Sequence, residues 1–296
     1  MADGRHFIPN MLSHNLRGLA LDNSKKSRIS SSDAKWSIIH SLTNSIDLVM
    51  LTETKTVLKT TQWANFFPLG RKFKPLTYSC TGLSDGIIIF GNTDSITNHT
   101  IDILQEGRAV LVQFKKNNYN YAIYTLYLSS SNYFNRIHTL HLVNDSISYI
   151  KRSHTQPKII LTGDFNIDLQ KNPTRQDSKV ISSILSSQNL TDLFLHNGFV
   201  TPTRIGDGLR ANHQNTIDYF FISNELLDQY KNVFHTVTPF SDHVILNAHS
   251  SNPYKPPQPP TPHSFLFKHP LFRSEASNTL HAHHQTFLEE HLDFFH

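Results

Sequence analysis

Cysteine is nearly absent from this sequence, which has one such residue, Cys80, among 296. A single thiol excludes a disulfide within the chain and any zinc module built from several cysteines. Long apolar runs are also missing: no stretch approaches the roughly 18 residues of a membrane-spanning helix, and the first residues lack the apolar core of a secretory signal. We therefore expect an intracellular protein, nuclear or cytoplasmic, that is neither secreted nor membrane-bound.

A strong charge of either sign is absent as well. The 27 Lys and Arg residues against 23 Asp and Glu residues give a formal net charge of +4 at pH 7. This small excess is compatible with a polyanionic partner and does not establish one. With 38% hydrophobic residues, the chain is long enough for one large core.

Proline is scarce until residue 250 and then becomes frequent, since half of the 14 prolines follow that position. A proline-dense stretch indicates an extended linker. We therefore predict one domain of residues 1–250, a linker of residues 251–264, and a tail of residues 265–296. We expect the tail to be poorly ordered or partly helical, as the truncated start of a following module.

Short apolar runs and a few helical patterns alternate through the predicted domain. Helical spacing of apolar residues predicts helices over Ala34–Ser45, Tyr133–Arg152 and Lys179–Gln188. Strand patterns occur in both halves of the domain, at residues 10–16, 47–53, 85–92, 109–116, 120–128, 158–166, 217–223 and 233–240. This order favours an α/β protein with two packed sheets flanked by helices.

Polar residues stand at the ends of several predicted strands. The apolar run Ile159–Leu161 leads into Asp164 and Asn166, which as strand positions i and i+2 would point to the same side. Glu53, Asp218 and the pair Asp242–His243 hold comparable positions. Carboxylates that gather without thiolates suit a hard cation such as Mg²⁺, with Mn²⁺ as an alternative.

Each of these residues also has a simpler interpretation. The segment around Asp164 and Asn166 is compatible with a turn that closes a strand. Tyr127 fits a core position within its strand, and Asn15 fits a turn before Gly18. Only the ordered combination of these segments argues for a shared site.

That ordered set resembles the endonuclease/exonuclease/phosphatase superfamily, which includes DNase I-like nucleases and apurinic endonucleases. The matching blocks run in the family's order from residue 11 to residue 247, and they are SHNLRGL, LVMLTETK, GIIIFGN, YTLYLSS, ILTGDFNIDL, TIDYFFIS and FSDHVIL. The resemblance implies a DNase I-like, four-layered α/β sandwich of two mostly antiparallel sheets flanked by helices. Within the superfamily the blocks look most like the endonuclease domains of LINE-type (non-LTR) retrotransposons.

The resemblance also implies roles for the matching residues. Glu53 matches the metal-binding glutamate, with Asn15 and Asp242 as supports of the metal. Asp164 matches the aspartate that activates the attacking water, and Asn166 the amide that holds a phosphate oxygen. His243 matches the histidine at the scissile phosphate, Asp218 the carboxylate that fixes its tautomer, and Tyr127 the tyrosine near the phosphate.

Contacts to substrate are expected from Thr203, Arg17 and Lys55. Further basic residues could contact phosphates, although a solvated surface charge is the better explanation for each; they are Arg71, Lys72, Lys74, Arg108 and Arg204.

Three hypotheses for the function follow. The first is a Mg²⁺-dependent endonuclease of a retrotransposon, a monomer that nicks DNA to give the 3′-hydroxyl from which a reverse transcriptase encoded downstream would prime. The second is a phosphatase or an apurinic-type endonuclease of the same superfamily. The third is a non-catalytic remnant that only binds nucleic acid. The intact acidic residues favour the first.

Overall fold

The computed structural model describes residues 8–17, 41, 45–55, 73–82, 85–205, 214–238 and 241–250. The chain divides into two units, Met1–Tyr254 and Lys255–His296. The predicted linker and tail, nearly all of the predicted helix Ala34–Ser45, and the candidates Arg71 and Lys72 lie outside the described residues.

The first sheet contains both ends of the domain. Its six strands are ordered β13-β14-β1-β2-β4-β3, and only β1 and β2 pair in parallel. The strands span Met11–Asn15 (β1), Leu48–Thr52 (β2), Phe73–Ser79 (β3), Ile87–Asn92 (β4), Asn232–Thr236 (β13) and Ile245–His249 (β14).

The second sheet also has six strands, in the order β5-β6-β7-β8-β12-β9. Here β7 and β8 are the parallel pair, and the remaining pairs are antiparallel. Its strands span Thr100–Gln105 (β5), Ala109–Lys116 (β6), Tyr119–Tyr127 (β7), Lys158–Asp164 (β8), Leu190–Asp192 (β9) and Asp218–Ser223 (β12). A separate short hairpin pairs Arg204–Ile205 (β10) with Gln214–Asn215 (β11).

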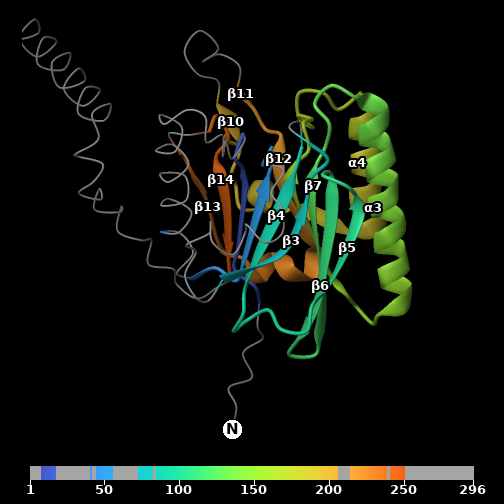
Figure 1. Cartoon of the computed structure of the whole chain (residues 1–296). Helices are drawn as coiled ribbons and strands as arrows, with labels where there is room; N and C mark the ends of the chain where they lie inside the picture. The colour runs from blue at the N-terminus through green and yellow to red at the C-terminus, as the bar shows by residue number, and fades with distance from the viewer. Residues whose placement is uncertain are drawn as a thin grey trace, which may run out of the picture. The chain divides into compact units, whose positions relative to one another are not determined.

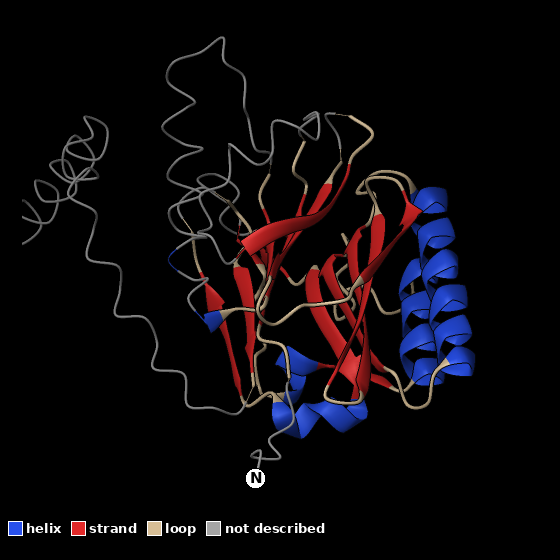
Figure 2. Cartoon of the chain, turned by 60° about the horizontal axis from the view of Figure 1, so that its bottom comes forward, coloured by secondary structure: helices blue, strands red, loops and turns tan. Residues whose placement is uncertain are grey.

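Two helices cover the outer face of the second sheet, as Figures 1 and 2 show. Helix α3 (Tyr133–Ser153) begins at Asn132, whose side chain accepts a hydrogen bond from the backbone N–H of Asn135. Helix α4 spans Gln176–Gln188 and ends at Asn189, which adopts the left-handed conformation common at helix C-termini. A short helix α5 (Leu193–His196) and a 3₁₀ helix η3 (Asn224–Gln229) complete the described helices.

Alternating side chains of the two sheets build the core between them. Met50 and Ile89 of the first sheet belong to the same buried cluster as Val112, Ile160 and Phe220 of the second. On its other face, the second sheet packs against the apolar side of α3 and α4. The outer face of the first sheet is also buried, through residues such as Val49 and Phe90. These layers confirm the predicted α/β sandwich of two packed sheets.

The pairing of the strands explains why the site forms at one end of the sandwich. Parallel pairing puts Asn15 of β1 beside Thr52 of β2, and Tyr127 of β7 beside Asp164 of β8. Strands β12 and β14 run antiparallel to these, so their first residues reach the same end. Asp218 is therefore paired directly with Asp164. Among the described residues, no helix has the length and apolarity needed to cross a membrane.

Candidate active site

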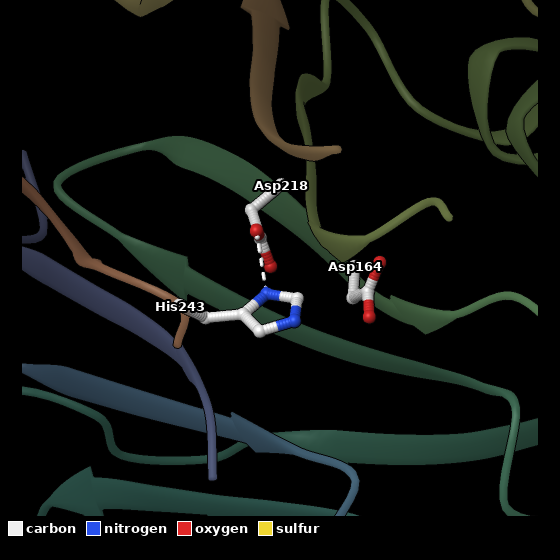
Figure 3. Close-up of side chains that lie close together, drawn as sticks. All are labelled: Asp164, Asp218 and His243. Atoms are coloured by element: carbon white, nitrogen blue, oxygen red, sulfur yellow. Dashed lines mark hydrogen bonds and ion pairs between the residues drawn. The ribbon is translucent and has the colours of Figure 1, made fainter. Parts of the chain in front are cut away.

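Three buried side chains, Asp164, Asp218 and His243, lie together at this end of the sheets (Figure 3). Each offers one ligand atom, and the three atoms lie within 4.8 Å of one another. One ring nitrogen of His243 is bonded to Asp218, and the other points toward the carboxylate of Asp164. The chain thus assembles a carboxylate–imidazole group from three separate strand ends.

A hydrogen-bonded chain fixes the imidazole of His243. Nδ1 of His243 lies 2.8 Å from Oδ2 of Asp218, which also accepts a hydrogen bond of 2.9 Å from the hydroxyl of Thr203. That hydroxyl in turn accepts from the backbone N–H groups of Ile217 and Asp218. Burial alone would lower the pKa of His243, but the carboxylate of Asp218 and its hydrogen bond raise that pKa to about 9. The ion pair with Asp218 therefore favours the protonated imidazole.

Asp164 is almost fully buried, and two amides hold its carboxylate. Oδ2 accepts from Asn15 Nδ2 at 2.7 Å and from Asn166 Nδ2 at 3.1 Å, while Oδ1 accepts from the backbone N–H of Asn166. Asn15 stands at the end of β1, so its bond joins the two sheets. Burial and the negative charge of Asp218 raise the pKa of Asp164, which suits a carboxylate that accepts a proton.

Asn166 reaches Asp164 by a route that differs from the one expected. Strand β8 ends at Asp164, and Asn166 has a φ of +52°, in the left-handed region. Its amide turns back to Asp164 and also donates to the carbonyl of Leu128 at 2.8 Å. Strand alternation was therefore the wrong reason for placing the two side chains together, since a turn after the strand does so. Phe165 between them packs edge-on against Tyr219 and Phe221.

Glu53 and Lys55, which follow β2, form an ion pair with each other. Both have positive φ angles, as does Arg17. Of the nine non-glycine residues described with positive φ, only these three and Gln156 are not asparagine, the residue type that tolerates this conformation best. Backbone strain concentrated at one site is a feature of functional regions.

Tyr127 is buried beside the carboxylates, and the guanidinium of Arg108 lies 4.8 Å from the centre of its ring. Burial, followed by the negative charges of Glu53 and Asp164, raises the pKa of the Tyr127 hydroxyl. Tyr127 is thus a neutral hydroxyl close to both carboxylates. Tyr127 therefore belongs to the core and also lies beside the site, so the two interpretations of the sequence both apply to it.

Asp242 binds two arginines. Its Oδ2 accepts a hydrogen bond from Nε of Arg204 at 3.0 Å and forms an ion pair with Nη1 of Arg17 at 3.2 Å. Its Oδ1 is buried, has no hydrogen-bond partner among the described residues, and lies 3.8 Å from Nε2 of His243. Burial opposes the charge on Arg204, yet the carboxylates of Asp242, Asp164 and Glu53 raise the pKa of Arg204, so all three carboxylates act on this one guanidinium.

The donor set fits a divalent cation. Glu53, Asp164, Asp218 and Asp242 lie at one end of the sheets, and burial, followed by the negative charge of Asp218, raises the pKa of Asp164, so that a further positive charge there would be favourable. A hard oxygen-preferring ion would supply that charge. Asn15 and Asp242 were expected to support the metal. In the structure Asn15 donates to Asp164, and Asp242 contacts Arg17 and Arg204, so their role at the metal stays a prediction.

The structure therefore places the predicted catalytic and metal-site residues at one end of the sheets, although several of their contacts differ from those expected. Thr203 is buried and bonded to Asp218, and Lys55 is paired with Glu53. Two contributors were missed. Ser241 donates to the carbonyl of Asn15 and accepts from the N–H of His243, and the carbonyl of Leu128 holds Asn166. Ser241 stands within the segment SDH, whereas a backbone carbonyl has no sequence signal.

Solved structures share this fold. The AP endonuclease LMAP from Leishmania major matches with a TM-score of 0.66 at 14% identity, over 83% of this chain and 88% of that chain. The APE2 catalytic domain of Xenopus laevis gives 0.62 at 16% identity, over 81% and 91%. A mannosyl-6-phosphatase of Bacteroides thetaiotaomicron gives 0.58 at 17% identity, over 82% and 99%.

The fold is a DNase I-like α/β sandwich, and the resemblance to the endonuclease/exonuclease/phosphatase superfamily is supported by these structures together with one family model. More particularly, residues 121–247 match the family model described as endonuclease-reverse transcriptase. This segment contains Tyr127, Asp164, Asp218 and His243. No curated protein sequence matches the chain.

Proposed function

We propose that this chain is a metal-dependent phosphodiester hydrolase, an endonuclease that nicks DNA. The observation that carries the proposal is the group of Asp164, Asp218 and His243, in which His243 is hydrogen-bonded to Asp218 and the three ligand atoms lie within 4.8 Å of one another. Hydrolysis of an anionic diester needs a proton acceptor for water, a donor to the phosphate and compensation of charge. Residues of this site can meet each of these three requirements.

Asp164 accepts the proton of the attacking water, and the raised pKa of its carboxyl favours that transfer near neutral pH. His243 donates to a phosphate oxygen through Nε2, because Nδ1 is occupied by Asp218. Asn15 and Asn166 hold the carboxylate of Asp164 in one orientation. Thr203 keeps Asp218 in place and acts on the reaction only through it.

Glu53 and Asp164 are the carboxylates that would hold a Mg²⁺ or Mn²⁺ ion. When bound, the cation supplies the positive charge that offsets the charge of the phosphate. In the absence of the ion, repulsion among the clustered carboxylates opposes binding of an anionic substrate.

A role in a retrotransposon belongs to the same proposal. It is supported by the family model, whose description combines an endonuclease with a reverse transcriptase, and by the order of the sequence blocks. The nick would leave a 3′-hydroxyl for a reverse transcriptase to extend. DNA is then the substrate and that polymerase the partner.

The test is nicking of supercoiled plasmid by the full chain in Mg²⁺. We expect Asp164→Asn to lower the rate by about 10²–10⁴-fold, because the general base is lost while the shape is kept. Asp145→Asn is the matched control, since Asp145 is an exposed acid on α3 away from the site. Chelation of the metal should stop nicking, and addition of Mg²⁺ should restore it.

Other outcomes separate the alternatives. Release of phosphate from small phosphoesters without nicking would favour a phosphatase, the activity named for the Bacteroides relative. Cleavage restricted to duplexes with an abasic site would favour an apurinic-type endonuclease. Metal-independent binding of DNA with no cleavage would favour a non-catalytic remnant. Equal nicking by the unmutated chain and Asp164→Asn would refute the assigned role.

A further inference from the structure

Arg108 contacts both an aromatic ring and a buried carboxylate at the end of the sheets where the site lies. Its guanidinium lies 4.8 Å from the centre of the Tyr127 ring, and its Nη1 donates to the backbone carbonyl of Tyr127 at 3.4 Å. Its Nη2 lies 4.0 Å from Oδ2 of Asp85. The N–H of Tyr127 also donates to the carbonyl of Arg108 at 2.8 Å. Arg108 and Tyr127 are therefore joined through side chain and backbone together.

The guanidinium of Arg108 is poorly accessible to a substrate. The side chain of Arg108 is 14% exposed, and that of Asp85 is 4% exposed. A basic residue that binds a phosphate turns its donors toward solvent, from where the phosphate arrives. The described contacts of Arg108 are made with Tyr127 and Asp85 instead. Arg108 therefore fits the role of a phosphate contact, which the sequence left open, poorly.

The turn that carries Arg108 is held by residues of the first sheet and its loops. Gly107 has a φ of +67°, and its N–H donates to the hydroxyl of Ser79 at 2.6 Å. Its carbonyl accepts from the N–H of Gly86 at 3.3 Å. A Cβ at Gly107 would lie 2.6 Å from Cγ of Asp85, so the turn packs directly on that carboxylate. The backbone from which Arg108 projects is thus fixed against both sheets.

Asp85 also holds the loop that carries Glu53. Its backbone carbonyl accepts a hydrogen bond of 2.9 Å from the N–H of Lys55, two residues after Glu53. Its side chain faces Arg108, which in turn contacts Tyr127. Tyr127 and Glu53 therefore share one support, although they belong to different sheets.

The charge of Arg108 acts on the hydroxyl of Tyr127. Burial, followed by the negative charges of Glu53 and Asp164, raises the pKa of that hydroxyl, and the hydrogen bond and charge of Arg108 oppose the rise. A neutral phenol is a hydrogen-bond donor, and only a ring held in one orientation presents this donor at a fixed place.

We propose that Arg108 is a positioning residue: it holds the side chain of Tyr127 beside Glu53 and Asp164, and it contacts no phosphate itself. This inference rests on the proposed function and deepens it. The hydroxyl of Tyr127 is the group that meets the substrate, and Arg108 acts on the reaction only through that hydroxyl.

The experiment combines a double-mutant cycle with two measurements that need no cleavage. The variants are Arg108→Gln, Tyr127→Phe and the two together, with Arg152→Gln on the exposed end of α3 as the matched control. Values of kcat and KM are measured on a DNA duplex in Mg²⁺. Binding of the duplex in EDTA is measured by fluorescence anisotropy across salt concentrations. Near-ultraviolet circular dichroism is recorded for each protein alone.

Arg108→Gln should lower kcat about tenfold with little change in KM, because the hydroxyl of Tyr127 is no longer held in place. Tyr127→Phe should lower kcat by at least as much, and the double variant should be no slower than Tyr127→Phe. The slope of log Kd against log salt concentration should stay unchanged in Arg108→Gln. Loss of a phosphate contact would make that slope shallower by about one.

The circular dichroism reports on Tyr127 itself. The difference between the unmutated chain and Tyr127→Phe gives the signal of this ring, which Arg108→Gln should lose and Arg152→Gln should keep. Arg108→Lys covers the case in which Arg108→Gln does not fold, because it keeps a positive charge opposite Asp85. It lacks the planar group that lies on the ring, so kcat and the Tyr127 signal should fall here too.

A shallower salt slope in Arg108→Gln would overturn the inference, because it would mean a contact with phosphate. Losses in kcat that multiply in the double variant would overturn it too, since Arg108 would then act apart from Tyr127. An unchanged Tyr127 signal in both Arg108 variants would do the same. If the unmutated chain does not cleave DNA, the proposed function fails alone, because loss of the Tyr127 signal in Arg108→Gln would still support the positioning role.

Discussion

Gly163 decides how closely β7 and β8 approach at the site. Its φ is +127°, and a Cβ at this position would lie 2.0 Å from the carbonyl oxygen of Leu126. No side chain fits between these strands. The absence of one lets Tyr127 and Asp164, which are neighbours in register, reach the site together. A glycine before an aspartate in the sequence therefore has a specific physical reason here.

We predict that Gly163→Ala lowers the free energy of unfolding by about 3 kcal/mol or more, since both the clash and the backbone conformation are unfavourable. Gly198→Ala is the control. Gly198 has a φ of +83° with nothing near its Cβ, so it should cost only about 1–2 kcal/mol, from the backbone term. Urea denaturation measures both. Losses of equal size would show that the contact with Leu126 relaxes.

Thr203 shows what the sequence could reveal about a residue and what it could not. The family resemblance suggested that it contacts substrate. In the structure its hydroxyl bonds to Asp218 and to two backbone N–H groups. The sequence placed it at the site correctly, but a hydrogen-bond partner 15 residues away depends on how the hairpin folds back.

At the scale of elements, the strands that could be predicted were those with continuous apolar runs. Strands β2, β4 and β8 are almost completely buried, and their continuous apolar runs gave their positions to within about two residues. Strands β3 and β5 are only partly buried and were missed, because polar residues at a sheet edge carry little strand signal. The buried strand β14 was missed as well, because Asn247 and His249 interrupt its apolar pattern. Helices α3 and α4 were predicted with small errors at their ends.

A buried ion pair joins α3 and α4 behind the site. Arg136 donates to Oδ2 of Asp177 through Nε at 3.0 Å and Nη2 at 2.9 Å. Its Nη1 donates to the carbonyls of Ser129 and Ser130. These residues follow Leu128, whose carbonyl holds Asn166, so the pair also fixes the loop beside the site.

We predict that Arg136→Met destabilises the fold by about 3 kcal/mol, because Asp177 loses a buried partner and two carbonyls lose their donor. Arg152→Met, on the exposed end of the same helix, should change stability by about 0.5 kcal/mol or less. Chemical denaturation of both variants is the measurement. Similar losses in the two would mean that the ion pair adds nothing to ordinary helix surface effects.

For the whole molecule, the order of the blocks along the chain carried most of the information. Each segment alone was compatible with a turn, and the site exists only because two sheets bring six distant segments to one end. The sequence could not show that Asp242 binds Arg17 and Arg204, since 225 and 38 residues separate them along the chain. Such contacts follow from packing of the sheets and not from local pattern.

The stability of the molecule should depend on pH through His249. Its ring is buried in β14, stacked at 5.4 Å on Phe234, and burial lowers its pKa to about 4. Between pH 6.5 and pH 4, His249 is therefore protonated in the unfolded chain but not in the folded chain. The contribution of His249 to the free energy of unfolding is fully present above pH 6.5. It is lost as the pH falls to 4, at up to about 1.4 kcal/mol per pH unit.

Other groups titrate in the same range with the opposite sign. Burial raises the pKa of Asp192 to about 6, which makes the folded chain bind the proton first. The measurement is therefore a difference: free energies of unfolding for the unmutated chain and His249→Leu, taken from pH 4 to pH 8. The variant should lose less stability on acidification, while His141→Leu at an exposed position should follow the unmutated chain. Parallel curves for His249→Leu and the unmutated chain would exclude His249 as the source, because the remaining titrating groups are common to both proteins.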